Sequence, residues 1–451
     1  MCPRAASVFA CQNCGATAPK WLGRCPECGE WNSYIEELRA EGSRSGPASP
    51  RSASVAIGEI GFEERPRLET GLPGLDRVLG GGLVPGSVVL LGGEPGIGKS
   101  TLLLQAGRGL ALQSREVLYA SAEESAAQVR LRGERLGIRD QKLLVLAETD
   151  VSGILAEAES RGPAVVVVDS VQAVREPALA SAPGTVSQVR AAATELARFA
   201  KSRGVPVLLV GHVTKDGTLA GPKSLEHLVD AVVSMEGERG STRRILRATK
   251  NRFGPVEELA LFEMSGEGLS EIPNASAALL SERRAGLAGS SVTAAREGTR
   301  SLLVEIQALV GAAVSGSPRR VALGLDSSRL ALLLAVLEGA GMGLASREVF
   351  VSCTGGLEIS EPGVDLAIAA ALASSVQNRP LPEAAVFFGE IGLLGEVRRV
   401  PSAVSRLREA AALGFSTAYL PAGNAPEAAA FPDLTIRPVD RVADFLKSLR
   451  S

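Results

Sequence analysis

Aromatic residues are scarce in this chain of 451 residues, at 4% of the total, so its cores must be built from Ala, Val, Leu and Ile. No apolar run reaches the roughly 18 residues that cross a bilayer, and the N-terminus lacks the apolar stretch of a secretory signal. The net charge of −2 argues against a basic coat for nucleic acid but leaves local patches open. These absences predict a cytoplasmic protein without a membrane partner.

Cysteine is also rare, with six in the chain, but four of them form a regular pattern near the N-terminus. The pattern is C-x2-C-x10-C-x2-C, and a glycine follows each pair, which suits a tight turn around a metal. In a reducing compartment four thiolates favour structural, tetrahedral zinc. A redox-active dithiol pair is the alternative. The predicted zinc ligands are Cys11, Cys14, Cys25 and Cys28.

Composition divides the chain into segments, because its length exceeds what one core usually holds. We expect a four-cysteine zinc finger over residues 1–40 and a flexible linker rich in Ser, Pro, Gly and Arg over 41–56. Residues 57–272 alternate apolar runs with helical patterns, which predicts an α/β nucleotide-binding domain with buried parallel strands. Residues 285–451 predict a second α/β or α+β domain. The expected strands are 88–91, 117–120, 143–146, 165–168, 207–210, 302–309, 349–353 and 385–388, and the expected helices are 329–337, 364–374 and 402–411.

A phosphate-binding loop is the clearest motif of the chain. The segment from Gly93 to Ser100 reads GEPGIGKS and lies between an apolar strand and a helical run, which is the context that G-x-x-x-x-G-K-[ST] requires. Its glycines let backbone N–H groups converge on phosphates at a helix N-terminus. Lys99 supplies charge for the β- and γ-phosphates, and the Ser100 hydroxyl can bind magnesium. A glycine-rich turn that binds nothing is the alternative.

Polar residues follow three other predicted strands. Asp169 suits a magnesium-binding Walker B carboxylate or a helix cap. Glu123 and Glu124 follow a strand that we expect beside the P-loop strand; Glu123 is the first choice to activate water and Glu124 the second, unless both are first-turn helix acids. His212 either senses the γ-phosphate or is structural.

Two basic features come later in the chain. A glycine-containing loop carries Lys215 and Lys223 and is either a binding loop or a solvated one. Lys250 and Arg252 belong to the sequence KNRFG, and at i and i+2 of an extended strand their side chains point to the same side. Such a pair can reach a phosphate in its own subunit or in a neighbour's, and an ordinary basic turn is the alternative.

In this order the motifs resemble one family, the bacterial RadA (Sms) ATPases of DNA recombination and repair. The resemblance rests on CQNCG and CPECGEWN, on ETGLPGLDRVLGGGLVPGSVVLLGGEPGIGKSTLLLQ (69–105), on KNRFG and on the C-terminal part. It implies an α/β fold with a RecA-like P-loop core, related to DnaB-type helicases, between a small zinc ribbon and a Lon-protease-like domain. It also implies a hexameric ring that binds single-stranded and branched DNA, promotes branch migration and works with a RecA-type recombinase, with ATP, magnesium and zinc as cofactors.

The resemblance also implies roles for individual residues. It places nucleotide on Gly93, Glu94, Pro95, Gly96, Ile97, Gly98, Lys99, Ser100 and Thr101. It assigns magnesium to Ser100 and Asp169, and catalysis to Lys99, Glu123, Asp169, Lys250 and Arg252. Lys250 and Arg252 match a motif that acts on a neighbour's nucleotide, so that hydrolysis depends on ring assembly. The loop with Lys215 and Lys223 corresponds to a DNA-facing loop.

The C-terminal domain resembles Lon protease, whose chemistry needs a Ser activated by a Lys. The nucleophile motif is replaced by EPGVDL (361–366), and the segment that matches the lysine motif, 397–407, contains no Lys. We therefore expect no peptidase activity, although an ATP-dependent protease and a scaffold ATPase without DNA are the competing functions. The domain is expected to build the ring and to offer arginines to DNA, unless they form a solvated face: Arg319, Arg320, Arg398 and Arg399.

Overall fold

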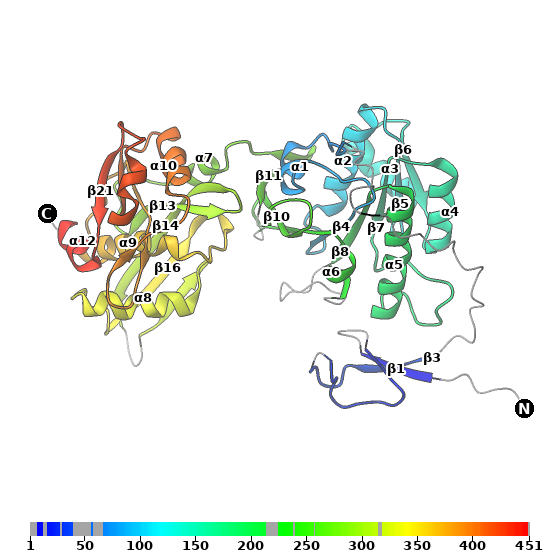
Figure 1. Ribbon diagram of the computed structural model, residues 1–451, viewed down its shortest axis with the longest axis horizontal. Coiled ribbons are helices and arrows are strands. Elements are labelled where there is room, and N and C mark those ends of the chain that lie inside the picture. Colours follow the sequence, from blue (N-terminus) through cyan, green and yellow to red (C-terminus); the bar gives the residue numbers. More distant parts are fainter. Residues whose placement is uncertain are drawn as a thin grey trace, which may run out of the picture. The chain divides into compact units, whose positions relative to one another are not determined.

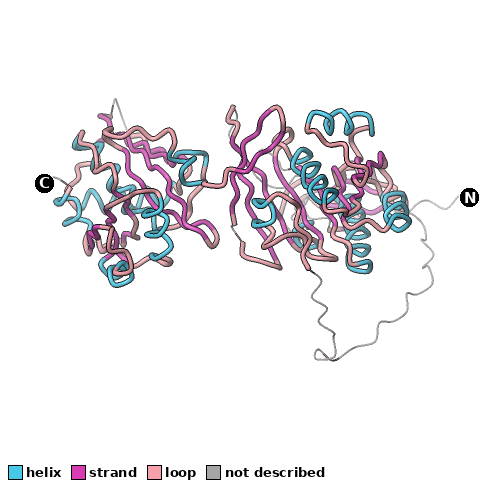
Figure 2. The backbone as a smooth tube through the Cα atoms, turned by 90° about the horizontal axis from the view of Figure 1, so that it is seen from above, coloured by secondary structure: helices cyan, strands magenta, loops and turns pink. Residues whose placement is uncertain are grey.

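The computed structural model describes residues 7–11, 16–27, 29–38, 56, 66–212, 224–237, 240–256, 258–313 and 318–449. The chain divides into two compact units, Met1–Glu271 and Ile272–Ser451 (Figure 1). Figure 2 shows strands in the middle of both units and helices around them. Among the described residues, no helix combines the length and apolar character that crossing a membrane requires.

A small antiparallel sheet lies at the N-terminal end of the first unit. Its strands β1 (Ser7–Cys11), β2 (Thr17–Ala18) and β3 (Tyr34–Leu38) have the order β2-β1-β3. Among the described residues of this sheet and its loops, four form the buried core, Cys11, Ala18, Cys25 and Tyr34, and three partly buried residues pack against them. Such a small core cannot stabilise an independent fold by itself. A module of this size therefore needs a bound metal or another cross-link.

The remaining strands of the first unit form one sheet with the order β12-β11-β10-β9-β4-β8-β7-β5-β6. All neighbours from β9 through β6 pair in parallel, whereas β9, β10, β11 and β12 pair antiparallel. The strands are β4 (Val88–Gly93), β5 (Val117–Ser121), β6 (Leu143–Ala147), β7 (Val165–Asp169), β8 (Val207–His212), β9 (Ala231–Glu236), β10 (Arg243–Asn251), β11 (Leu259–Ser265) and β12 (Gly268–Glu271). The helices are α1 (Pro73–Val78), α2 (Lys99–Leu112), α3 (Ala126–Arg135), α4 (Val151–Arg161), α5 (Val186–Arg203) and α6 (Ser224–Leu228).

Apolar side chains of β4 alternate between two cores. Val89 and Leu91 pack with residues of α1, α2 and α3, whereas Val88 and Leu90 pack with α4, α5 and α6 on the other face. A parallel strand that is covered on both faces reads as a continuous apolar run, so the sequence lacks the alternation of a half-exposed strand. The five strands expected in this region are present and parallel, as predicted.

The order of the strands corrects one expectation. The strand before Glu123, β5, does not neighbour the P-loop strand β4, because β7 and β8 lie between them. The sequence could not show this, because the order of parallel strands depends on which crossover connections pack against which face.

The second unit contains a mixed sheet with the order β15-β16-β14-β13-β17-β20-β21 and a short hairpin of β18 and β19. Its strands are β13 (Ser290–Glu297), β14 (Arg300–Ala312), β15 (Arg320–Leu323), β16 (Arg347–Cys353), β17 (Ala385–Phe387), β18 (Glu390–Ile391), β19 (Val397–Arg398), β20 (Thr417–Pro421) and β21 (Thr435–Val439). Its helices are α7 (Ala275–Leu280), α8 (Ser327–Gly339), α9 (Asp365–Gln377), α10 (Ala403–Ala412), α11 (Ala425–Ala428) and α12 (Val442–Ser448).

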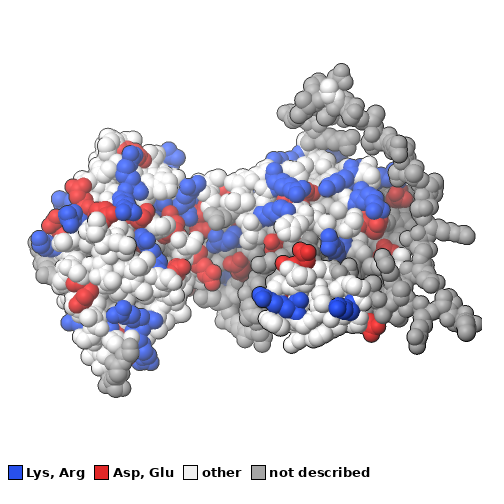
Figure 3. Space-filling view, turned by 60° about the horizontal axis from the view of Figure 1, so that its bottom comes forward, with Lys and Arg blue, Asp and Glu red and all other residues white. Residues whose placement is uncertain are grey.

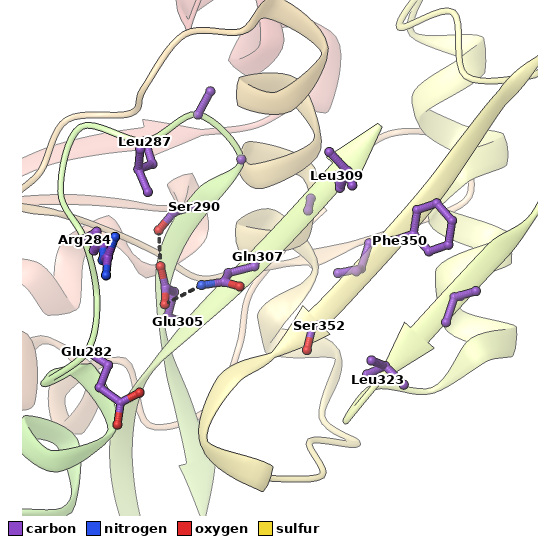
Figure 4. Close-up of a pocket in the computed structure, with 15 residues that line it drawn as sticks. Glu282, Arg284, Leu287, Ser290, Glu305, Gln307, Leu309, Leu323, Phe350 and Ser352 are labelled. Carbon is purple, nitrogen blue, oxygen red and sulfur yellow. Dashed lines mark hydrogen bonds between the residues drawn. The ribbon is translucent and has the colours of Figure 1, made fainter. Parts of the chain in front are cut away.

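Helices cover both faces of this sheet around β13. Ser291 Oγ donates to the main-chain oxygen of Ala367 on α9, at 2.8 Å. The next residue, Val292, faces the opposite side and packs with Leu407 of α10. Figure 4 shows the residues that line a pocket over β14, β15 and β16, where Glu305 accepts hydrogen bonds from Ser290 Oγ and Gln307 Nε2. The apolar side chains that line this pocket include Leu287, Leu309, Leu323 and Phe350.

Candidate nucleotide site

The loop between β4 and α2 has a backbone that requires glycine. Gly96 and Gly98 have φ values of 78° and 121°, which side chains on an L-residue disfavour. A Cβ at Gly93 would lie 2.7 Å from the main-chain oxygen of Met235 on the neighbouring strand β9. The loop ends where α2 begins at Lys99, so its amides meet the positive end of a fourteen-residue helix. The geometry fits a bound phosphate group.

Lys99 lies inside this loop and is only 4% exposed. Its Nζ donates to the main-chain oxygens of Gly93 and Glu94, at 2.8 and 2.9 Å. Burial lowers the pKa of Lys99, whereas the nearby carboxylates of Asp169 and Glu123 raise it. The predicted cation and both predicted carboxylates are therefore close enough to influence one another.

Asp169 ends β7 and is bound by a residue that the sequence did not suggest. The buried Tyr119 hydroxyl, on the adjacent strand β5, donates to Asp169 Oδ2 at 2.5 Å. Burial and, after it, the charge of Asp169 raise the pKa of Tyr119 well above its ordinary value, so the hydroxyl keeps its proton and remains a donor. The available signal was a single tyrosine within a mostly aliphatic strand, Val117–Ser121.

The two candidate glutamates have different partners. Glu124 forms a two-pronged ion pair with Arg132 of α3, with N–O distances of 2.6 and 2.7 Å. Glu123 is exposed and accepts a hydrogen bond from Ser170 Oγ, next to Asp169. Although β5 and β4 are not neighbours, the carboxyl ends of parallel strands meet at one edge of the sheet, and this brings Glu123 to the loop.

Strand β10 contacts the loop at its first end. Arg244 Nε donates to the main-chain oxygen of Ile97 at 2.9 Å. The same guanidinium donates through Nη1 to the main-chain oxygens of Ser241 and Arg243, at 2.6 and 2.8 Å, and is thereby fixed in place. No sequence motif distinguishes Arg244 from the other arginines of the chain.

Lys250 and Arg252 lie at the other end of β10. Lys250 Nζ donates to the main-chain oxygens of Glu226 and Val229, at the end of α6. Arg252 pairs with Asp230 at 3.0 Å, and the other oxygen of Asp230 accepts from the Val88 amide, also at 3.0 Å. Burial lowers the pKa of Lys250, and the charge of Arg252 lowers it further.

This end of β10 lies where the parallel strands begin, whereas the P-loop of the same chain lies where they end. Asn251 pairs with Ala231, which lies beside Val89 at the beginning of β4, whereas the loop follows Gly93 at its end. At about 3.3 Å per residue, β4 separates the two edges by roughly 15–20 Å. This arrangement argues against a phosphate on the P-loop of the same chain, and it leaves two of the alternatives, a phosphate in another subunit and an ordinary basic turn.

The cysteine module shows two similar knuckles. Cys11 and Cys25 are buried, and the amide of each donates to the main-chain oxygen five residues later, Ala16 or Glu30. Their sulfur atoms also lie near hydroxyl groups, with Cys11 Sγ 3.1 Å from Ser33 Oγ. Two matching turns around buried thiols fit a tetrahedral zinc ion. The other two predicted ligands, Cys14 and Cys28, lie outside the described residues.

The structure describes some of the remaining predicted site residues, and others lie outside the described part of the chain. His212 ends β8 in register with Gly93, whereas Lys215 and Lys223 lie outside the described part of the chain. Most of the arginines proposed for DNA already pair with carboxylates: Arg319 with Glu348, Arg398 with Glu390 and Glu396, and Arg399 with Glu427. On the face shown in Figure 3, basic and acidic side chains are interspersed.

In the second unit, ion pairs occupy the segment that replaces the protease nucleophile motif. Arg406 is fully buried and forms a two-pronged pair with Glu361 at 2.6 and 2.7 Å. A Cβ at Gly363 would lie 3.1 Å from Glu361 and 3.2 Å from Arg406. Asp365, also buried, pairs with Arg329 and accepts from the Ile391 amide at 2.9 Å.

Comparison with known proteins gives a consistent assignment along the chain. Residues 9–36 match the rubredoxin metal binding domain, residues 63–218 the AAA domain, and residues 295–424 subunit ChlI of Mg-chelatase. DNA repair protein RadA of Bacillus subtilis (strain 168) is 50% identical over 425 residues, which cover 93% of each chain. DNA repair protein RadA of Escherichia coli (strain K12) is 48% identical over 433 residues, 94% of each chain.

Two solved structures align with part of the chain. The RadB recombinase covers 46% of this chain and 99% of its own, with 22% identity and a TM-score of 0.37. The KaiC-like protein PH0186 from Pyrococcus horikoshii OT3 covers the same shares, with 20% identity and a TM-score of 0.39. The sheet topology and the domain matches confirm the predicted fold class, a RecA-like P-loop core with a zinc ribbon before it and a Lon-like domain after it.

Proposed function

Because this chain belongs to the RadA family of DNA repair proteins, we propose that it is a DNA-dependent ATPase that drives branch migration of recombination intermediates as a hexameric ring. Its partners in this proposal are single-stranded and branched DNA and a RecA-type recombinase, in the cytoplasm. The observation that carries the proposal is the position of Lys250 and Arg252 at the sheet edge opposite to their own P-loop. A cation pair in this position can serve a nucleotide only in another subunit.

We assign the ATP site to the loop from Gly93 to Thr101. In the structure, Lys99 Nζ donates to the main-chain oxygens of Gly93 and Glu94. When ATP binds, Lys99 leaves these oxygens and pairs with the β- and γ-phosphates. Ser100 and Asp169 would hold magnesium, which supplies charge neutralisation on the phosphates when it is bound. Glu123 is the residue that orients water, because Glu124 is committed to Arg132.

The remaining assignments follow the domain order. We propose residues 1–40 as the zinc finger, with Cys11, Cys14, Cys25 and Cys28 as ligands, and 41–56 as linker. Residues 57–272 form the motor, and Lys215 and Lys223 belong to its DNA-binding loop. Residues 285–451 are a Lon-like domain without peptidase activity, because segment 361–366 contains no Ser and segment 397–407 no Lys, and the two segments are joined instead by the buried pair of Arg406 and Glu361.

The first experiment compares ATP hydrolysis with and without single-stranded DNA for wild type and Lys99→Ala. We expect DNA to stimulate wild type and the variant to be inactive, since its loop has lost the charge that faces the phosphates. Hydrolysis that is indifferent to DNA would instead indicate a nucleotide switch whose target is a protein. Degradation of casein by the purified chain would establish the protease alternative.

A mixing experiment tests the role of Lys250 and Arg252 across subunits. Lys99→Ala subunits have an inactive loop but an intact cation pair, whereas Arg252→Ala subunits have the reverse. If the pair acts across an interface, mixing the two inactive variants restores part of the activity, because some intact loops then face intact pairs. If it acts within one chain, every mixture remains inactive.

A further inference from the structure

Both tryptophans of the chain lie on the small cysteine module, and both are exposed. The exposed fractions are 51% for Trp21 and 65% for Trp31. Tryptophan is usually among the most buried residues on average, and the core of this module is made without it, from Cys11, Ala18, Cys25 and Tyr34. The two indoles therefore contribute little to the fold and are available to a ligand.

One indole is paired with a fixed cation. The guanidinium carbon of Arg24 lies 5.6 Å from the centre of the Trp31 ring. Arg24 and Trp31 face each other across an antiparallel bridge, and Arg24 Nε donates to the main-chain oxygen of Gly29 at 2.9 Å. This bond keeps the guanidinium beside one side of the indole while the ring stays largely open to solvent.

The other indole lies against the same short segment of backbone. Trp21 packs against Gly23, where an ideal Cβ would lie 3.7 Å from two atoms of the indole ring. The main-chain oxygen of Gly23 accepts from the Asn32 amide at 2.8 Å, next to Trp31. Gly23 and Arg24 are consecutive, so one short two-stranded segment carries both rings. The exposed Lys20 precedes Trp21, which gives the second indole an adjacent cation as well.

Alternating indoles and cations are suited to an unpaired strand, whose bases stack on aromatic rings while its phosphates meet cations. A duplex has no exposed base faces to stack. The module has no excess of positive charge, however, because the exposed Glu27 and Glu30 balance Lys20 and Arg24. Its affinity for a strand must therefore come mainly from stacking rather than from attraction to phosphates.

We infer that Trp21 and Trp31 form a stacking platform for bases of single-stranded DNA, with Lys20 and Arg24 beside the adjacent phosphates. The inference rests on the proposed function, in which single-stranded DNA is a partner, and adds a contact site outside the ATPase core. It also predicts a characteristic salt response. Each phosphate contact to a single strand contributes about −0.7 to the slope of log affinity against log salt, whereas stacking contributes almost nothing.

The intrinsic fluorescence of the full-length chain tests the platform, because both of its tryptophans lie there. We expect unlabelled oligo(dT) to quench this fluorescence in a saturable way, over the concentration range in which a labelled oligo(dT) shows binding by anisotropy. Trp21→Ala and Trp31→Ala should each weaken binding by about 5- to 100-fold while leaving the salt slope unchanged. Lys20→Ala should lower the steepness of the slope by about 0.7.

Ile35→Ala is the matched control, because Ile35 is a 55% exposed apolar side chain of the same module without a ring. It should bind oligo(dT) like wild type, and all variants should retain the zinc content of wild type. Binding by anisotropy without quenching, or tryptophan variants that bind normally, would overturn the platform but not the DNA motor. Quenching by a purified recombinase and not by oligo(dT) would reassign the indoles to a protein. Absence of any DNA binding with ATP at low salt would overturn both proposals.

Discussion

Arg244, on β10, donates a hydrogen bond to the main-chain oxygen of Ile97 in the middle of the phosphate-binding loop, at 2.9 Å. No motif contains this arginine, yet its hydrogen bond connects the antiparallel half of the sheet to the nucleotide site. Two other main-chain oxygens hold Nη1 of the same guanidinium, so the side chain is fixed on β10 and its hydrogen bond to Ile97 restrains the loop.

We expect Arg244→Met to lower kcat/KM for ATP by about 10- to 100-fold, the equivalent of one lost hydrogen bond from a charged group. The loss should lie mainly in KM, because the loop would have to be ordered by the nucleotide itself. Steady-state kinetics measure this, with Arg130→Met as control, since Arg130 forms only an exposed pair with Glu134 on α3. Unchanged kinetics would reduce the contact to a structural detail.

Tyr119→Phe should raise the magnesium concentration required for half-maximal ATP hydrolysis by about 3- to 10-fold. The Tyr119 hydroxyl holds the Asp169 carboxylate in one orientation, and without it the carboxylate is no longer oriented toward the magnesium ion before the ion binds. Titration of magnesium at saturating ATP measures the shift. Because the pKa of Tyr119 is raised, its hydroxyl stays protonated at pH values near the ordinary tyrosine pKa of about 10. Tyr119 should therefore cause no change in the magnesium requirement of wild type between neutral pH and these values. A variant with the wild-type requirement would show that Asp169 needs no such support.

Exchange of the two neighbouring glutamates for glutamine should separate their roles. Glu123→Gln should abolish turnover, by at least about 100-fold, while retaining ATP binding, because the carboxylate of Glu123 lies close enough to Lys99 to affect its pKa. Glu124→Gln should lower the free energy of unfolding by about 1 kcal/mol, because its pair with Arg132 is partly exposed. ATPase assays and thermal unfolding of both variants measure this, and the reverse result would exchange the assignments.

Arg406→Met should destabilise the second unit by about 3–5 kcal/mol, because Glu361 would lose its buried partner. Differential scanning calorimetry measures the change, and a unit that tolerates the substitution would contradict it. Arg406→Met combined with Glu361→Leu should recover much of the loss, since removing both charges leaves no unpaired one.

The sequence predicted well those features that are local in the chain. The P-loop, the run that becomes β7 with Asp169, and the helices α8, α9 and α10 of the second unit all depend on spacing within a few residues, and the structure contains them. What it could not predict depends on strand order. The separation of β5 from β4, the approach of Tyr119 to Asp169, and the contact of Arg244 with a loop 147 residues earlier arise only when distant segments pair.

One strand thus holds both a loop and a cation pair, at opposite ends of β10. In the proposed ring this gives the assembly a sense of rotation, because each subunit receives a cation pair from one neighbour and supplies its own to the other. A subunit with a defective pair would silence a site that is not its own. In rings that mix wild-type and Arg252→Ala chains, each defective chain removes one active site, so activity should fall in proportion to the fraction of defective chains, although every lost site belongs to a neighbour.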